Sequence, residues 1–267
     1  MPLITVYSPK GGVGKTTLAA NLCHALSGMG LKTVAVDLDP QNALRLHFGI
    51  SLADNSGFVA SATQSAMWSK HLVATQHHAF VLPYGVPTLQ QRSGFEMHLI
   101  REPQFVARGL QELLAQPDLI VVADLPSGHL HALQSLLPVT DVLLSPLLAD
   151  TASLSLLPVV ENLFADVATQ ESAPACYVVI NQADYRRKIS KDVEGFMVQR
   201  LNDAVLGMVH RDESVVEANA AQQSIAAVNH ASVAAFDIEV ISKKLAEKLG
   251  LVTTDGSMFS APAPHHA

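Results

Sequence analysis

The chain has 267 residues, of which 49% are hydrophobic and 15% charged, and its formal net charge is −7 at pH 7. This length suits one large domain with a buried core, and the negative balance argues against a broadly basic surface for nucleic acid. No apolar run approaches the roughly eighteen residues of a membrane span, the N-terminus enters a strand instead of a signal peptide, and two cysteines give no disulfide framework. We therefore expect a cytoplasmic protein with one domain over residues 1–250 and a disordered tail over residues 251–267.

Short apolar runs alternate with helical patterns along the chain. Near-continuous apolar runs are typical of parallel strands covered on both faces, and apolar spacings of three to four residues indicate helices. The predicted strands are Leu3–Ser8, Thr33–Asp37, Ala79–Leu82, Leu119–Ala123, Val142–Ser145, Cys176–Asn181 and Val205–Val209. The alternation predicts an α/β fold, a doubly wound and mostly parallel sheet flanked by helices. Residues 53–78 are polar and rich in small side chains, and we expect helix plus loop there.

Glycines cluster between the first predicted strand and a helical segment from Thr17 to Met29. This order of strand, glycine-rich loop and helix is what a phosphate-binding loop requires. The glycines let backbone N–H groups turn toward phosphate oxygens, and the helix N-terminus adds partial positive charge. We predict that Lys15 reaches the β- and γ-phosphates and that the Thr16 hydroxyl holds Mg²⁺. The predicted nucleotide-binding residues of this loop are Lys10, Gly11, Gly12, Val13, Gly14, Lys15, Thr16 and Thr17.

Carboxylates stand at the carboxyl ends of two predicted strands. Asp37 and Asp39 lie just before Pro40, and Asp124 follows the hydrophobic run Leu119–Ala123. Ligands of open α/β sheets bind at this edge, so we expect the carboxylates near the nucleotide. A hydrophobic strand that ends in one acid is the pattern in which the carboxylate meets Mg²⁺. Each aspartate also has a simpler interpretation. Asp37 or Asp39 could be a turn former before Pro40, and Asp124 could be only the N-cap of the next helix.

The glycine loop resembles the deviant Walker A loop of the MinD/ParA family of dimeric ATPases, because Pro9 replaces the usual first glycine and Lys10 follows it. The resemblance implies ATP and Mg²⁺ as cofactors and an ATP-dependent homodimer, in which Lys10 reaches the phosphates of the partner's nucleotide. A solvated surface lysine is the alternative. The resemblance also implies that Asp39 positions the attacking water and that Asp37 supports Mg²⁺ through water. The implied catalytic residues are Lys10, Lys15 and Asp39, and the implied metal residues are Thr16, Asp37 and Asp124.

Two later segments resemble the parts of that family that surround the base. Asn181 ends a predicted strand at the position whose asparagine recognises adenine in these ATPases. His210 and Arg211 lie in a segment similar to the family's loop beside the base, with His210 in place of the usual proline. The resemblance therefore implies cofactor contacts at Asn181, His210 and Arg211.

Three stretches resemble the BcsQ branch of this family, which serves bacterial cellulose biosynthesis: Leu44–Phe48, Leu82–Gly85 and His210–Glu213. The resemblance implies a slow, partner-regulated ATPase that assembles or regulates the cellulose synthase secretion complex. The implied partners are a small BcsR-type subunit, a BcsE-type regulator and the inner-membrane cellulose synthase. Any attachment to the inner membrane would then be peripheral and would depend on these partners.

Other functions stay open. A ParA- or MinD-type ATPase that positions DNA or another cargo would use the same loop, but it needs a basic face or a cationic membrane helix. The last predicted helix, about Ser232 to Leu249, has mixed charges and does not favour a membrane helix. A nucleotide-locked scaffold that does not hydrolyse ATP fits the same motifs. The basic cluster in Tyr185–Lys191 frames the base, binds an acidic partner or is a solvated loop.

Overall fold

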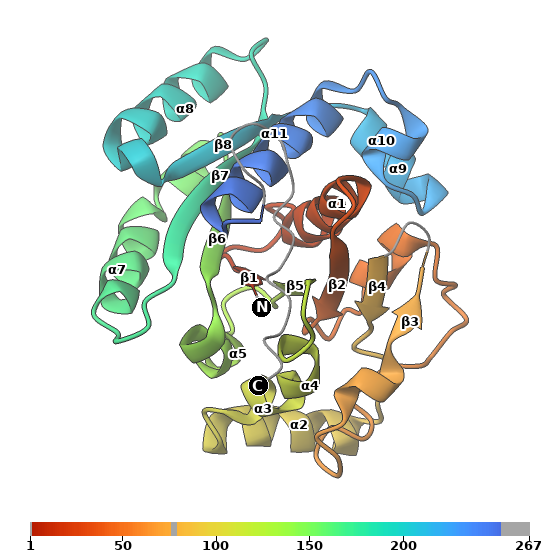
Figure 1. Cartoon of the computed structure of the whole chain (residues 1–267). Coiled ribbons are helices and arrows are strands. Elements are labelled where there is room, and N and C mark those ends of the chain that lie inside the picture. The colour runs from red at the N-terminus through yellow and green to blue at the C-terminus, as the bar shows by residue number, and fades with distance from the viewer. Residues whose placement is uncertain (1, 76–78, 252–267) are drawn as a thin grey trace, which may run out of the picture.

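The strands form one twisted sheet of eight, in the order β3-β4-β2-β5-β1-β6-β7-β8 (Figure 1). The structure is a computed structural model that describes residues 2–75 and 79–251. All neighbouring strands are parallel except β3 and β4, which are antiparallel. The strands are β1 (Leu3–Val6), β2 (Lys32–Asp37), β3 (Val73–Ala74), β4 (Ala79–Leu82), β5 (Leu119–Asp124), β6 (Val142–Leu148), β7 (Ala175–Ala183) and β8 (Val205–His210).

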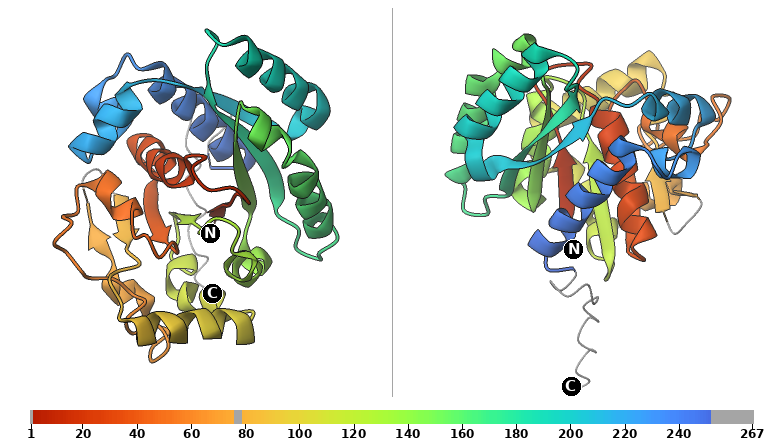
Figure 2. Two further views of the ribbon diagram at one scale, coloured as in Figure 1. Left: turned by 180° about the vertical axis from the view of Figure 1, so that it is seen from behind. Right: turned by 90° about the horizontal axis from the view of Figure 1, so that it is seen from above.

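Helices cover both faces of the sheet (Figures 1 and 2). One face carries α1 (Lys15–Gly28), α9 (Ser214–Ala221), α10 (Ile225–Val228) and α11 (Val233–Lys248). The other carries α2 (Leu89–Arg101), α3 (Phe105–Gly109), α4 (Gln111–Leu114), α5 (Leu130–Leu136), α7 (Leu157–Ala168) and α8 (Lys188–Leu201). The short elements are α6 (Thr151–Leu154), η1 (Leu44–Phe48), η2 (Trp68–His71), η3 (Leu137–Val139) and η4 (Asn202–Ala204).

Successive residues of β1 pack into hydrophobic clusters on opposite faces of the sheet. Ile4 and Val6 of β1 pack with α1 and α11, whereas Leu3 packs on the opposite side with residues such as Phe95 of α2. Both sets are fully buried. Since neither face meets water, exposed polar residues do not alternate along β1, and its one polar side chain, Thr5, is buried and hydrogen-bonded to Thr140.

The expected helix in residues 53–78 is wrong for its described part, which runs to residue 75. This part consists of turns, the short η2 helix and the two-residue β3, a strand that the sequence analysis missed. Phe58 and Trp68 hold it to the core, with ring centroids 4.4 Å apart and both side chains buried. Gly57 lies against Gly85 so closely that a side chain on either would overlap the other's backbone. Aromatic anchors and close backbone contact thus replace a regular helix.

The predicted fold class is confirmed, and each of the seven predicted strands is present with ends shifted by at most a few residues. The final helix begins after Ser232, whose side chain accepts the N–H of Ala235, and ends before Gly250 at φ +67°. Within residues 2–75 and 79–251, no helix is long and apolar enough to span a membrane. The tail predicted for residues 251–267 lies outside the described residues apart from Leu251, and the single domain over 1–250 stays a prediction.

Candidate nucleotide site

The glycine loop joins β1, which lies between β5 and β6 in the sheet, to the start of α1. Gly12 and Gly14 have φ of +73° and +85°, a left-handed conformation that glycine adopts without strain. A Cβ on Gly14 would in addition overlap the amide of Asn181. Among the described residues no side chain caps α1 at Gly14, so the N–H groups of its first turn are available to an anion.

Lys15 lies at the start of α1 and is buried. Its ammonium donates a hydrogen bond to the hydroxyl of Ser127, in the loop that follows β5. Burial lowers the pKa of Lys15, and the negative charges of Asp124 and Asp39 oppose this effect. The sequence analysis missed Ser127 as a residue of this site. Its position three residues after Asp124 is the signal that could have indicated it.

Asp124 is a buried carboxylate whose pKa is raised by its surroundings. It ends β5 opposite Asp37 of β2, and both residues are fully buried. Neither carboxylate oxygen of Asp124 has a hydrogen-bond partner among the described residues. Burial raises the pKa of Asp124 to about 7, although the Thr16 hydroxyl, which lies near the carboxylate without forming a well-aligned hydrogen bond, and the charge of the Lys15 ammonium lower it. Burying an unpaired carboxylate is costly, and a hydroxyl beside a free carboxylate is a donor set that suits Mg²⁺. The residues present therefore fit the predicted metal.

Asp37 shapes the loop that follows β2. Its two oxygens accept the N–H groups of Asp39 and Leu44, at 2.9 and 3.1 Å. Burial and the charge of Asp124 raise the pKa of Asp37 well above its ordinary value, against the effect of these backbone donors. Asp39 is half-buried and accepts the N–H of Gln41. The metal role of Asp37 and the water-positioning role of Asp39 stay predictions.

Arg45, one of the residues that carried the BcsQ resemblance, is buried in the same region. Its guanidinium donates hydrogen bonds to the backbone carbonyls of Asn42, Ser51 and Asp54. Three carbonyls from one loop satisfy a buried cation that would otherwise be costly. Arg45 thus fixes the path of residues 42–54 beside the predicted site.

Lys10 is held within its own chain. Its ammonium lies 3.2 Å from Oδ2 of Asp150 and 3.4 Å from Oγ of Ser153. Asp150 caps α6 by accepting the N–H of Ser153 at 2.7 Å. The lysine is therefore not the freely solvated side chain of the alternative interpretation. Asp150 and Ser153 are further residues that the sequence analysis missed, because nothing local relates them to a loop 140 positions away.

Asn181, His210 and Arg211, the three residues predicted to contact the base, lie close together in the structure. They line a pocket of about 240 Å³ that also includes Gly14 and Thr17. Asn181 donates its amide to the carbonyl of Val13 at 2.7 Å and accepts the N–H of Gln182 at 2.9 Å. The pocket joins the end of β7 directly to the glycine loop.

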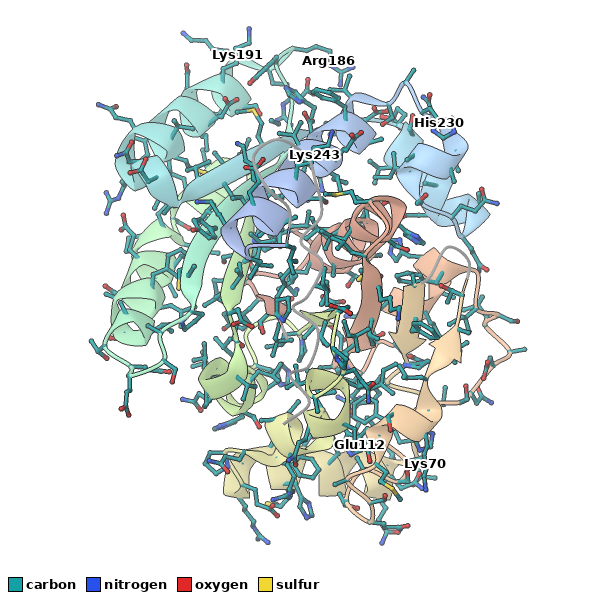
Figure 3. All side chains as sticks on the ribbon, in the orientation of Figure 1. Lys70, Glu112, Arg186, Lys191, His230 and Lys243 are labelled. Atoms are coloured by element: carbon teal, nitrogen blue, oxygen red, sulfur yellow. The ribbon has the colours of Figure 1, made fainter. Side chains whose placement is uncertain are left out.

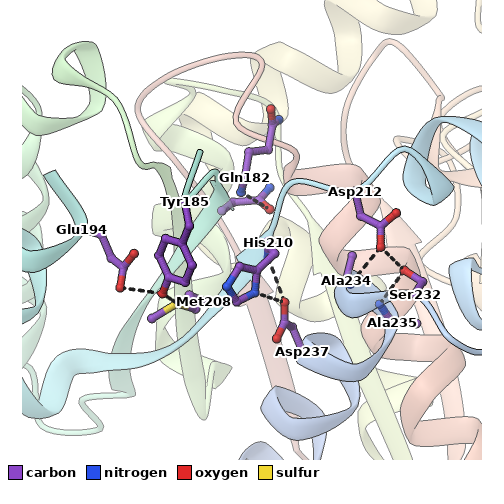
Figure 4. Close-up of polar contacts among 11 residues, drawn as sticks. Gln182, Tyr185, Glu194, Met208, His210, Asp212, Ser232, Ala234, Ala235 and Asp237 are labelled. Atoms are coloured by element: carbon purple, nitrogen blue, oxygen red, sulfur yellow. Dashed lines mark hydrogen bonds and ion pairs between the residues drawn. The ribbon is translucent and has the colours of Figure 1, made fainter. Parts of the chain in front are cut away.

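Asp237 of α11 holds one wall of this pocket. Its Oδ2 accepts the backbone N–H of His210 at 2.8 Å and lies 2.7 Å from Nδ1 of the same residue (Figure 4). Arg211 donates its backbone N–H to the carbonyl of Ala183. The sequence analysis missed Asp237, and the contacts of Asn181, His210 and Arg211 with a base stay predictions.

A family model described as cellulose biosynthesis protein BcsQ matches residues 1–245. The Escherichia coli (strain K12) protein of that description is 24% identical over 259 residues, which cover 96% of this chain and 99% of that protein. The solved structure of the septum site-determining protein MinD from Pyrococcus horikoshii with Mg-ADP has a TM-score of 0.73 at 20% identity, covering 93% of this chain and 97% of that one. Cobyrinic acid a,c-diamide synthase from Mycobacterium smegmatis, with bound ATP analogue and magnesium, has a TM-score of 0.74 at 22% identity, covering 97% and 100%.

These findings agree at two levels. The solved structures share the fold and contain Mg-ADP or an ATP analogue with magnesium, which agrees with the predicted cofactors, ATP and Mg²⁺. The family model spans nearly all of the described chain, and the MinD/ParA-like, BcsQ-type resemblance is confirmed. The protein is therefore a member of the BcsQ family of cellulose biosynthesis proteins.

Proposed function

We propose that this protein is a Mg²⁺-dependent ATPase whose ATP-bound homodimer takes part in assembling the bacterial cellulose synthase complex. The observation that carries the proposal is the buried, unpartnered carboxylate of Asp124 beside Thr16 and Lys15, at the end of a glycine loop. A buried carboxylate of this kind suits a cation, and the N–H groups of the glycine loop suit an anion. Mg·ATP supplies both.

The proposed roles follow from position. The glycine loop and the first turn of α1 bind the phosphates, and Lys15 exchanges Ser127 for phosphate oxygens. Mg²⁺, when bound, would neutralise the charge on Asp124 and on the phosphates. Asp39 is half-buried next to this site, where it orients the attacking water.

Lys10 is proposed to exchange partners when the dimer forms. It leaves Asp150 and Ser153 of its own chain and contacts the phosphates bound to the second chain. A half-exposed ion pair contributes at most about 1 kcal/mol, so phosphate can displace Asp150. The ion pair then sets a small energetic threshold for dimerisation.

The link to cellulose rests on the family and on relatives such as the Escherichia coli protein named for cellulose biosynthesis. A small BcsR-type subunit, a BcsE-type regulator and the inner-membrane synthase are the proposed partners. The ATP-bound dimer would present the surface that they bind, and hydrolysis or partner binding would reset it. Recruitment to the membrane would occur through these partners.

The test is the molar mass in solution with Mg·ATP, Mg·ADP or no nucleotide, repeated with a BcsR-type partner. We expect an ATP-dependent dimer that Lys10→Ala abolishes and that Lys70→Ala, on a distant surface, leaves unchanged. Asp150→Ala frees Lys10 in both chains, so its dimer should form at protein concentrations up to about thirtyfold lower. Phosphate release should require Asp39, as measured with Asp39→Ala.

Two outcomes would contradict the proposal. A protein that stays monomeric under every condition would contradict the proposed contact of Lys10 with the nucleotide of a second chain. A dimer that ignores both nucleotide and Lys10 would favour a scaffold that holds ATP without hydrolysis.

A further inference from the structure

The loop between β7 and α8 concentrates positive charge on an acidic protein. Four of the 17 lysines and arginines fall within six positions, and the whole chain carries a formal charge of −7. This basic cluster consists of Arg186, Arg187, Lys188 and Lys191, all exposed. Nothing in the nucleotide site accounts for such a cluster.

An open groove of about 550 Å³ lies beside the basic cluster. It is lined by Ala183–Arg186, His210–Glu213 and Val233. Two of the lining residues are large apolar side chains that face solvent, Tyr185 at 45% and Val233 at 52% exposure. Exposed apolar side chains around a hollow, with charge at the rim, are typical of sites where another molecule binds.

Contacts on several sides of Tyr185 hold the groove in shape. The Tyr185 hydroxyl donates to Glu194 at 3.1 Å, and its ring lies edge-on to His210 with centroids 4.9 Å apart (Figure 4). The ammonium of Lys191 lies 5.7 Å from the centre of the same ring. Because Tyr185 is already ordered, a ligand would lose little binding free energy in fixing it.

The rim is ordered as well. Arg186 donates from its backbone N–H and its guanidinium to the carboxylate of Asp184. The N–H of Asp184 donates to the hydroxyl of Ser190 at 3.0 Å. Arg187, Lys188 and Lys191 form no ion pair among the described residues, so their charges are available to a partner.

We propose that this groove docks an acidic peptide segment of a partner protein. One aromatic or large apolar side chain of the segment packs against Tyr185 and Val233, and its carboxylates pair with the basic cluster. Opposite charge attracts such a segment and orients it, and a buried aromatic anchor supplies most of the affinity. The carboxylates of Asp184, Asp212 and Glu213 line the groove itself, so the apolar anchor enters the groove and the segment's own carboxylates lie over the basic cluster at its rim. A uniformly charged phosphate backbone has no such apolar anchor.

The groove shares the segment His210–Glu213 with the pocket at the glycine loop. A partner in the groove and a nucleotide in that pocket therefore contact the same chain segment. Any change in nucleotide affinity on docking must be matched by an equal change in partner affinity. Docking itself requires no hydrolysis, so it can be tested even if the ATPase proposal fails.

The experiment is a fluorescence anisotropy titration of the full chain with a labelled peptide that carries one tryptophan flanked by glutamates. We expect saturable binding at low salt, with Kd below about 100 µM, and weaker binding when serine replaces the tryptophan. Arg187→Glu combined with Lys188→Glu should weaken it at least about tenfold. The matched control is Lys70→Glu, because Lys70 lies at the end of the molecule opposite Arg186 and Lys191 (Figure 3). Tyr185→Ala should abolish binding, and Tyr185→Phe, which keeps the ring, should retain it.

Several results would overturn the proposal. One is that the wild type shows no saturable peptide binding. Another is that the Arg187→Glu, Lys188→Glu variant binds the peptide with the same affinity as wild type. A third is that the wild type binds a single-stranded oligonucleotide of the same charge more tightly than it binds the peptide. If Tyr185→Ala fails to fold, as circular dichroism would show, the Arg187 and Lys188 substitutions still decide, because both side chains are exposed.

Discussion

Replacing Asp124 with asparagine should stabilise the nucleotide-free protein at alkaline pH, although it removes a predicted metal ligand. The carboxylate is buried without a hydrogen-bond partner among the described residues, and burial raises its pKa from 3.8 to about 7. Above pH 7 the folded protein must therefore hold a negative charge that the unfolded chain exposes to water. Asparagine occupies a similar volume without that charge.

The magnitude and its pH dependence follow from this pKa. The folded and unfolded values differ by about 3 pH units, and each unit corresponds to about 1.4 kcal/mol, so the charge costs up to about 4 kcal/mol at pH 8. Between pH 4 and pH 7 the folded state binds a proton that the unfolded state releases, so this group makes stability fall as pH rises. The asparagine amide still needs partners, and we expect Asp124→Asn to gain about 2 kcal/mol at pH 8 and nothing near pH 4.

The assay is urea unfolding of both proteins in EDTA at several pH values, then with Mg²⁺ and ADP added. Wild type should gain stability from Mg·ADP, and Asp124→Asn should gain much less. Asp192→Asn, which removes an exposed carboxyl on α8, is the control for the loss of one charge. A variant that is less stable than wild type at pH 8 without metal would refute the account of Asp124.

Burial lowers the pKa of His47 to about 4, so the unfolded chain takes up a proton near pH 6.5 that the folded chain refuses. His47 should therefore cost stability as pH falls from about 6.5 to 4, by up to about 3 kcal/mol. His47→Gln should remove that slope in urea unfolding, and a slope equal to that of wild type would contradict it. Gly109→Ala should destabilise the fold by about 1–3 kcal/mol, because its Cβ would overlap a buried indole ring. The matched change Gly195→Ala, in α8 with no atom within 4 Å of the new Cβ, should stabilise it by about 0.5–1 kcal/mol; equal thermal shifts for the two would count against the packing argument.

The sequence alone determined the elements of the sheet and the glycine loop, because these depend on local patterns. A strand covered on both faces reads as an apolar run wherever it lies, which is why β1 and β5 were predicted nearly to their ends. The loop from Lys10 to Thr17 likewise needs glycines at fixed spacings in one stretch of chain. The helix expected in residues 53–78 is absent from the described part, which runs to residue 75, because contacts with distant residues shape this segment. Phe58 and Trp68 are held by contacts with distant aromatic rings, and no local pattern carries those contacts.

Only the tertiary structure decided which side chains meet. The pairing of Lys10 with Asp150 joins residues 140 positions apart, and His210 meets Asp237 because α11 packs beside β8. The surroundings of the Asp124 carboxylate depend on strand order. Because β5 lies between β2 and β1, Asp124 at its end stands in register with Asp37 at the end of β2. Periodicity records whether a side chain is buried, because burial selects residue type at each position. It does not record the partner, which is chosen by the order of strands and the packing of helices.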